Sequence, residues 1–119
     1  MKQQRGDGDE APVFVRAYDL YTWLQDRLGG EPPSSRAAPA LRQACRLLDA
    51  VTLAVRGRGI DRRLEEAQEA ALLLTVHLRA VAQAGQLSDR QQLHAHDALR
   101  DIGRQLTGWQ RHRSGRRRS

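Results

Sequence analysis

The sequence predicts an all-α protein that folds as an antiparallel, up-down-up-down four-helix bundle. Apolar residues recur at helical spacing in four segments, and short links rich in Gly, Pro or Ser separate these segments. No alternating strand pattern competes with them. The apolar residues are mainly Ala, Leu and Val, and aromatic residues are few, which suits helices better than sheets. The 119 residues are the size of one domain.

The first half of the chain predicts helices over residues 12–28 and 35–56. Pro12 suits a first helical position, where its missing N–H costs no hydrogen bond. A Gly-Gly pair ends the first helix, Ser35 offers an N-cap for the second, and Gly57 and Gly59 are C-cap candidates. The apolar stripes are Val13, Ala17, Leu20, Leu24 and Leu28 in the first helix and Leu41, Ala44, Leu48, Val51 and Val55 in the second.

The second half predicts helices over residues 61–84 and 88–113. Asp61 is a natural N-cap for the third helix, and Ser88 with Gln91 three residues later forms a capping-box pattern for the fourth. The third helix is apolar over most of its circumference, so we expect it to be the most buried helix or to face a second subunit. Its stripe is Leu64, Ala67, Ala71, Leu74, Leu78 and Val81, widened by Leu72, Leu73 and Val76, and the fourth stripe is Leu99, Ile102, Leu106 and Trp109.

Charge divides the chain into a balanced bundle, residues 12–113, and a basic tail, residues 114–119, after a polar segment 1–11 that we expect to be disordered. The whole chain has a net charge of +6, yet residues 1–110 carry 15 basic against 14 acidic side chains. A cationic arm on a nearly neutral body favours a polyanionic partner, of which nucleic acid is the leading candidate. A membrane surface, or a tail that only aids solubility, are the alternatives.

The fourth predicted helix carries a flank of arginines that leads into the tail. Arg100, Arg104 and Arg111 lie roughly along this flank. Asp97 and Asp101 each precede one of these arginines by three residues, which predicts surface ion pairs of small individual value. The flank is therefore a candidate for phosphate contacts that the acids only partly neutralise.

Arg79 is the one basic residue in the apolar part of the third helix. It has two interpretations, a positioned phosphate contact or a cap for the C-terminus of its own helix. The predicted nucleic-acid- or partner-binding set is Arg79, Arg100, Arg104 and Arg111, with Arg113, Arg116, Arg117 and Arg118 from the end of the chain.

Motifs for catalysis or metal binding were not found. The chain lacks a P-loop, a dinucleotide fingerprint, a nucleophile elbow and a zinc-protease helix, and it has no Glu-x-x-His for a di-iron bundle. Cys45 is alone on or beside an apolar stripe, where packing is its expected role, and His94 and His96 point to opposite sides of a helix. We therefore expect no enzyme activity, metal or cofactor. Without a signal peptide or membrane-length apolar run, we expect a cytoplasmic protein.

Several runs in the second half resemble one known family. They are Leu64 to Arg79, then Leu87-Ser88, and above all Gly103-Arg104-Gln105-Leu106-Thr107-Gly108-Trp109. These runs are similar to the accessory variability determinant (Avd) proteins of diversity-generating retroelements. That family belongs to a four-helix-bundle superfamily related to proteins encoded in 23S ribosomal RNA intervening sequences.

The resemblance implies a homopentameric barrel of four-helix bundles with a basic surface. It implies a non-catalytic accessory protein that binds the element's reverse transcriptase and template RNA or cDNA, and that supports mutagenic reverse transcription. From the family, Arg79 and Arg104 carry over as nucleic-acid or partner contacts. Thr75, by contrast, stands where the family leads us to expect a basic residue. The alternative is a generic four-helix oligomeric interaction module with a basic nucleic-acid-binding tail.

Overall fold

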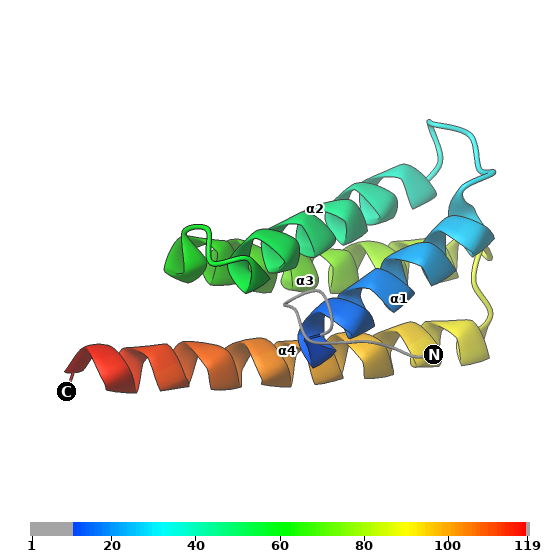
Figure 1. Cartoon of the computed structure of the whole chain (residues 1–119). Helices are drawn as coiled ribbons and strands as arrows, with labels where there is room; N and C mark the ends of the chain where they lie inside the picture. Colours follow the sequence, from blue (N-terminus) through cyan, green and yellow to red (C-terminus); the bar gives the residue numbers. More distant parts are fainter. Residues whose placement is uncertain (1–10, 119) are drawn as a thin grey trace, which may run out of the picture.

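Four α-helices in the order that the sequence predicts make up the fold. The computed structural model describes residues 11–118, with side chains as far as residue 116, so the expectation for residues 1–10 and Ser119 lies outside the described residues. Each helix packs against its neighbours in sequence, and α1 also packs against α4 to close the bundle (Figure 1). The helices are α1 (Pro12–Leu28), α2 (Ala37–Val55), α3 (Ile60–Gln83) and α4 (Asp89–Arg118).

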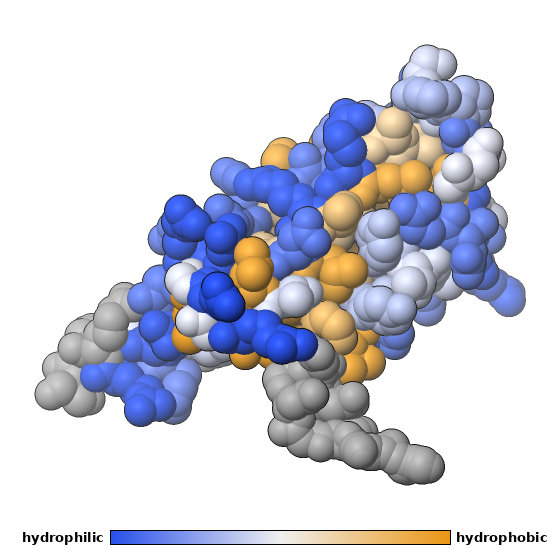
Figure 2. Space-filling view, turned by 45° about the horizontal axis from the view of Figure 1, so that its top comes forward, coloured by the Kyte–Doolittle hydropathy of each residue, from blue (hydrophilic) through white to orange (hydrophobic). Residues whose placement is uncertain are grey.

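The core of the bundle is aliphatic. Its buried side chains are Ala, Leu, Val and Ile, and among the described residues no polar or charged side chain is buried. Alanines line α2 and α3 where they meet, and such small side chains let two helix backbones approach closely. The outer surface is mostly hydrophilic on the face shown in Figure 2, with hydrophobic residues exposed in an interrupted band across its middle. No helix in the described part of the chain is long and apolar enough to cross a membrane.

Local sequence signals set most helix ends. The predicted capping box is confirmed, because the Gln91 N–H donates to Ser88 Oγ (3.1 Å) and the Ser88 N–H donates to Gln91 Oε1 (2.9 Å). Gly57 ends α2 and Gly85 ends α3 in the left-handed conformation, at φ 80° and 81°. In both places the N–H groups of the glycine and of the residue after it donate to carbonyls of the last helical turn, which is a Schellman motif. Gly59 is not a C-cap of α2 but the left-handed N-cap of α3. It lies two residues before the predicted N-cap, Asp61, which belongs to the first turn.

The third helix is not buried on all sides. Leu72 is 66% exposed and Val76 is 54% exposed, and Leu73 beside them is also exposed. Because only α2 and α4 pack against α3, the remaining apolar residues lie on its outer face. Seven of its 24 residues are buried, against seven of 19 in α2, so the expectation that α3 is the most buried helix is wrong.

The fourth helix is longer than expected. It continues to Arg118, past the predicted end at residue 113, so the residues assigned to a basic tail are helical as far as they are described. Arginine is a good helix former and no proline interrupts the run. With 30 residues against 17 in α1, α4 extends beyond the N-terminal end of α1 (Figure 1). Its last turns therefore lie beside α3 and lack α1 as a neighbour.

Candidate nucleic-acid interface

A shallow groove between α3 and α4 brings together most of the predicted arginines of the bundle. Arg100, Arg104 and Arg111 lie on one side of α4, because their spacing of four and seven residues returns to nearly the same direction on a helix. Two consecutive hollows make up the groove. Gln68, Gly103, Arg104, Thr107, Gly108 and Arg111 line the first, and Thr75, Leu93, His96, Leu99 and Arg100 line the second.

The floor of the first hollow is fixed by Gln68 of α3. Its Nε2 atom donates to Thr107 Oγ1 at 3.0 Å and to Gln110 Oε1 at 3.1 Å, so it joins α3 to α4. Gly103 and Gly108 have no side chain to fill the hollow, and an added Cβ at either would meet no other atom within 4 Å. The groove is therefore open to a ligand that comes close to the helix backbone.

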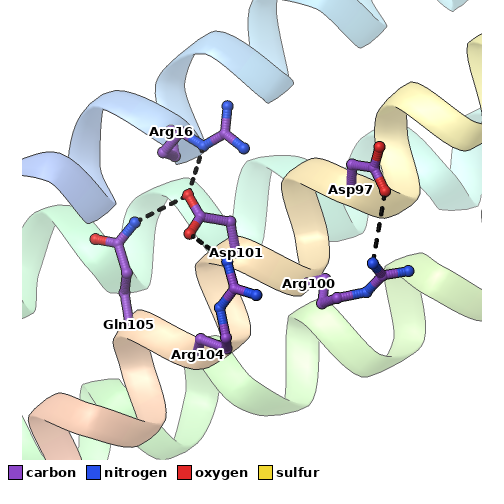
Figure 3. Close-up of polar contacts among 6 residues, drawn as sticks. All are labelled: Arg16, Asp97, Arg100, Asp101, Arg104 and Gln105. Atoms are coloured by element: carbon purple, nitrogen blue, oxygen red, sulfur yellow. Dashed lines mark hydrogen bonds and ion pairs between the residues drawn. The ribbon is translucent and has the colours of Figure 1, made fainter.

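The predicted ion pairs on α4 are confirmed. Arg100 Nη1 lies 3.7 Å from Asp97 Oδ1, and Arg104 Nη2 lies 3.2 Å from Asp101 Oδ1 (Figure 3). Both arginines remain largely exposed, at 68% and 71% of their side-chain surface. Exposed pairs of this kind are weak, so each guanidinium retains donors for a phosphate.

Asp101 is shared among three helical neighbours. Its Oδ2 atom accepts hydrogen bonds from Arg16 Nε of α1 at 2.8 Å and from Gln105 Nε2 at 3.1 Å, in addition to the Arg104 contact (Figure 3). The hydrogen bond from Arg16 is the main cause that lowers the pKa of Asp101 below its usual value. This carboxylate is thus held by α1 and compensates Arg104 only in part.

Arg79 lies on the same side of α3 as the groove, because it follows Thr75 by one helical turn. Its side chain is exposed and makes no hydrogen bond or ion pair with another described residue. The end of α3 is closed instead by its Schellman motif and by Arg36 Nη1, which donates to the carbonyl of Ala80 at 3.3 Å. Of the two interpretations of Arg79, the one in which it caps the C-terminus of α3 is therefore not observed.

The terminal arginines do not form one cluster. Arg113 donates through Nε to Asp61 Oδ1 at 2.6 Å, which raises the pKa of Arg113 and ties the end of α4 to the start of α3. Arg116 lines a separate open hollow with Trp109, His112 and Arg113. The backbones of Arg117 and Arg118 continue α4, but their side chains lie outside the described residues.

Several contributors to the site were not predicted. Arg16 is 85 residues from Asp101, and no local pattern announces that pair. Gly103 and Gly108 stand inside a helix, where glycine is unfavourable, and this cost is the signal that would have pointed to the groove floor. Arg46 lies elsewhere: it pairs with Glu69 and Gln43 at the α2–α3 surface.

Cys45 and His94 lie outside the groove and make packing and polar contacts within the bundle. Cys45 Sγ lies beside Asp49, and burial is the main cause that raises the pKa of the thiol, which leaves it a poor nucleophile. His94 packs on the Trp23 ring at 4.7 Å between centroids, and Arg27 covers that ring at 4.3 Å. Across the described residues, no group of three or more His, Cys, Asp or Glu side chains is placed to hold a metal ion.

Comparison with protein-family models, with curated proteins and with solved structures gave no match to this chain.

Proposed function

We propose that this protein is a non-catalytic nucleic-acid-binding protein whose ligand lies along the α3–α4 groove. The observation that carries the proposal is the row Arg100, Arg104 and Arg111 beside a groove floored by glycine. At a rise of 1.5 Å per residue, the row spans about 16 Å, the length of roughly five nucleotide steps in a helical strand. Arg79 adds a cation on the opposite wall. The groove holds the sugar-phosphate backbone and leaves base contacts to other surfaces.

The resemblance in residues 103–109 extends this proposal to a biological role. We propose that the protein acts in the cytoplasm as an accessory of a diversity-generating retroelement. In this role it binds the reverse transcriptase and the template RNA or cDNA, and it supports mutagenic reverse transcription while the polymerase supplies the chemistry. The protein works as a homo-oligomer, for which the resemblance implies five subunits. Binding along the groove does not depend on that number.

Salt-dependent binding to a structured RNA tests the groove. We compare the triple variant Arg100→Ala, Arg104→Ala and Arg111→Ala with a control that loses three exposed arginines elsewhere, Arg42, Arg58 and Arg62. Each lost phosphate contact lowers the slope of log K against log salt by about 0.7 to 0.9. We expect the groove variant to lose a slope of about 2 to 3 and the control to lose much less. Equal losses in the two variants would overturn the groove as the binding site.

A second candidate, an interaction module that binds another protein, is favoured by the exposed apolar residues Leu72, Val76 and Leu93. The two candidate functions predict different effects of substitutions on partner capture. If this candidate is correct, Leu72→Ala and Val76→Ala abolish partner capture, and the groove variant leaves it unchanged. A reverse-transcriptase gene and an imperfect repeat pair next to this gene would favour the first candidate over the second.

A further inference from the structure

The inner face of α4 changes character where α1 ends. Ile102 and Leu106 on this face are buried, and Trp109, one turn later, is only partly covered by the core. The next two positions of the same face, at steps of four and three residues, are Arg113 and Arg116. Because α1 does not reach these turns (Figure 1), the core face of α4 continues into solvent as an aromatic ring and two cations.

These side chains border an open hollow of about 360 Å³, which is lined by Trp109, His112, Arg113 and Arg116. Helical side chains lean toward the N-terminus of their helix, so those of Arg113 and Arg116 extend over the turn that begins at Trp109. The volume is at the lower end of the range for small-ligand sites. No carboxylate is among the described residues that line the hollow. Its chemistry therefore suits a flat ligand that carries negative charge.

The two arginines of the hollow differ in how they are held. Asp61 Oδ1 accepts a hydrogen bond from Arg113 Nε at 2.6 Å, which fixes Arg113 before any ligand binds. Arg116 is exposed, and its side chain makes no hydrogen bond or ion pair with another described residue. Arg113 is therefore a positioned wall of the hollow, and Arg116 is the arginine whose donors remain available to a phosphate.

We propose that this hollow binds one unpaired nucleotide of the bound nucleic acid, with the base stacked on the Trp109 indole and the phosphate at Arg116. An indole stacks on any base, because every base has a π face, and the flat guanidinium of arginine adds a charge. Bases inside a duplex are covered by their neighbours, so only an unpaired base can enter. The inference rests on the proposed function in that the ligand is nucleic acid, and it adds a base contact to the backbone contacts of the groove.

The hollow and the arginine row of the groove lie on opposite sides of α4. Trp109 and Arg111 are two residues apart, so their side chains point about 200° away from each other around the helix. Gly108 and His112 lie between these two directions, and both are exposed. A single strand that leaves the groove at Arg111 therefore reaches Trp109 across an open surface, whereas a duplex is too stiff to follow that turn.

An RNA hairpin in two forms, blunt and with a short single-stranded extension, separates the two sites. We expect the extension to strengthen binding to the wild-type protein at least about fivefold, the effect of one base stacked on an aromatic side chain. Trp109→Leu keeps an apolar side chain against the core but has no ring. This variant should lose the advantage of the extension and bind the blunt hairpin as the wild type does.

Charge variants locate the phosphate contact. Arg116→Ala should lose most of the advantage of the extension. Arg42→Ala should keep it, because Arg42 is an exposed arginine of α2, a helix that does not pack against α4. Thermal unfolding of each variant, Trp109→Leu above all, checks that the bundle remains folded.

Tryptophan fluorescence measures the stacking in a protein that keeps Trp109. The other indole, Trp23, packs against His94, about 22 Å along α4 from Trp109, and Trp23→Phe removes its signal. In this variant we expect a short single-stranded RNA to quench the fluorescence of Trp109. The blunt hairpin should leave the fluorescence nearly unchanged, since it offers no free base.

The outcomes distinguish this inference from the proposed function. Equal affinity for the blunt and extended hairpins, an advantage that Trp109→Leu retains, or a single strand that does not quench Trp109 would each overturn the inference. If the blunt hairpin binds through the groove arginines and the extension adds nothing, the inference alone fails. If the single strand quenches Trp109 while the groove variant binds the blunt hairpin as the wild type does, the proposed groove alone fails.

Discussion

Arg16 and Asp101 join the first helix to the last through a hydrogen-bonded ion pair of 2.8 Å between Nε and Oδ2. Arg104 and Gln105 contact the same carboxylate from α4. Asp101 therefore has two effects at once: it stabilises the packing of α1 on α4 and it restrains one arginine of the groove. A single substitution at this position separates stability from ligand binding.

The substitution Asp101→Asn is expected to destabilise the fold at neutral pH by up to about 1 kcal/mol, since the pair is part-exposed. Because the folded-state pKa of Asp101 is lowered, its ionised form stabilises the protein above the unfolded value of about 3.9. That contribution is lost as the pH falls through the folded-state pKa. Urea unfolding over a pH series measures the free energy of unfolding of both proteins. The difference between Asp101→Asn and wild type should become smaller at acid pH. The exposed Asp97→Asn is the control, and a gap that stays constant with pH would contradict the prediction.

The same Asp101→Asn variant is expected to bind nucleic acid more tightly. It removes a negative charge and releases Arg104 from its carboxylate, so the free energy of unfolding and the affinity change in opposite directions. Fluorescence anisotropy with a structured RNA measures the effect. Asp26→Asn gives the same change in net charge on α1, away from the groove, and should raise the affinity less. If both variants bind equally, net charge alone determines affinity.

Sequence reasoning succeeded where the deciding interactions are local. The Ser88–Gln91 capping box and the Asp97–Arg100 pair each lie within one helical turn, so spacing predicts them. Prediction from the sequence failed where segments that are distant in sequence meet. The end of α4 is held by the contact between Arg113 and Asp61, which are 52 residues apart. The exposed outer face of α3 could not be told from a buried face for a related reason. Apolar periodicity reports which residues are apolar, whereas packing decides which of them are covered.

The contact of Arg113 with Asp61 is expected to order the last turns of α4. Arg113→Ala removes it, and because α1 does not reach this part of the helix, the turns around residues 110–116 should open more often. Hydrogen exchange of these amides is the measurement, with little change expected in the core of the bundle. Arg116→Ala is a matched control, since it removes the same charge without an ion pair to a described residue. Equal acceleration in both variants would show that the Asp61 contact does not hold the helix end.

Replacement of Gly103 and Gly108 by alanine is expected to stabilise the protein and to weaken its binding of RNA. An alanine Cβ fits at both positions without a clash, and alanine is favoured over glycine inside a helix by about 1 kcal/mol, so the free energy of unfolding should rise. The two methyl groups would also project into the hollow that Arg104 and Arg111 line, where the proposed ligand approaches the backbone.

We therefore expect Gly103→Ala with Gly108→Ala to weaken RNA binding several-fold while thermal unfolding shifts to higher temperature. Gly115→Ala is the control, because it is also helical and also open to a Cβ but lies outside the groove. A merely structural role for the two glycines would leave affinity unchanged or raise it together with stability. Because stabilisation and weaker binding rarely arise from one cause, their joint appearance would place the ligand against the helix backbone at Gly103 and Gly108.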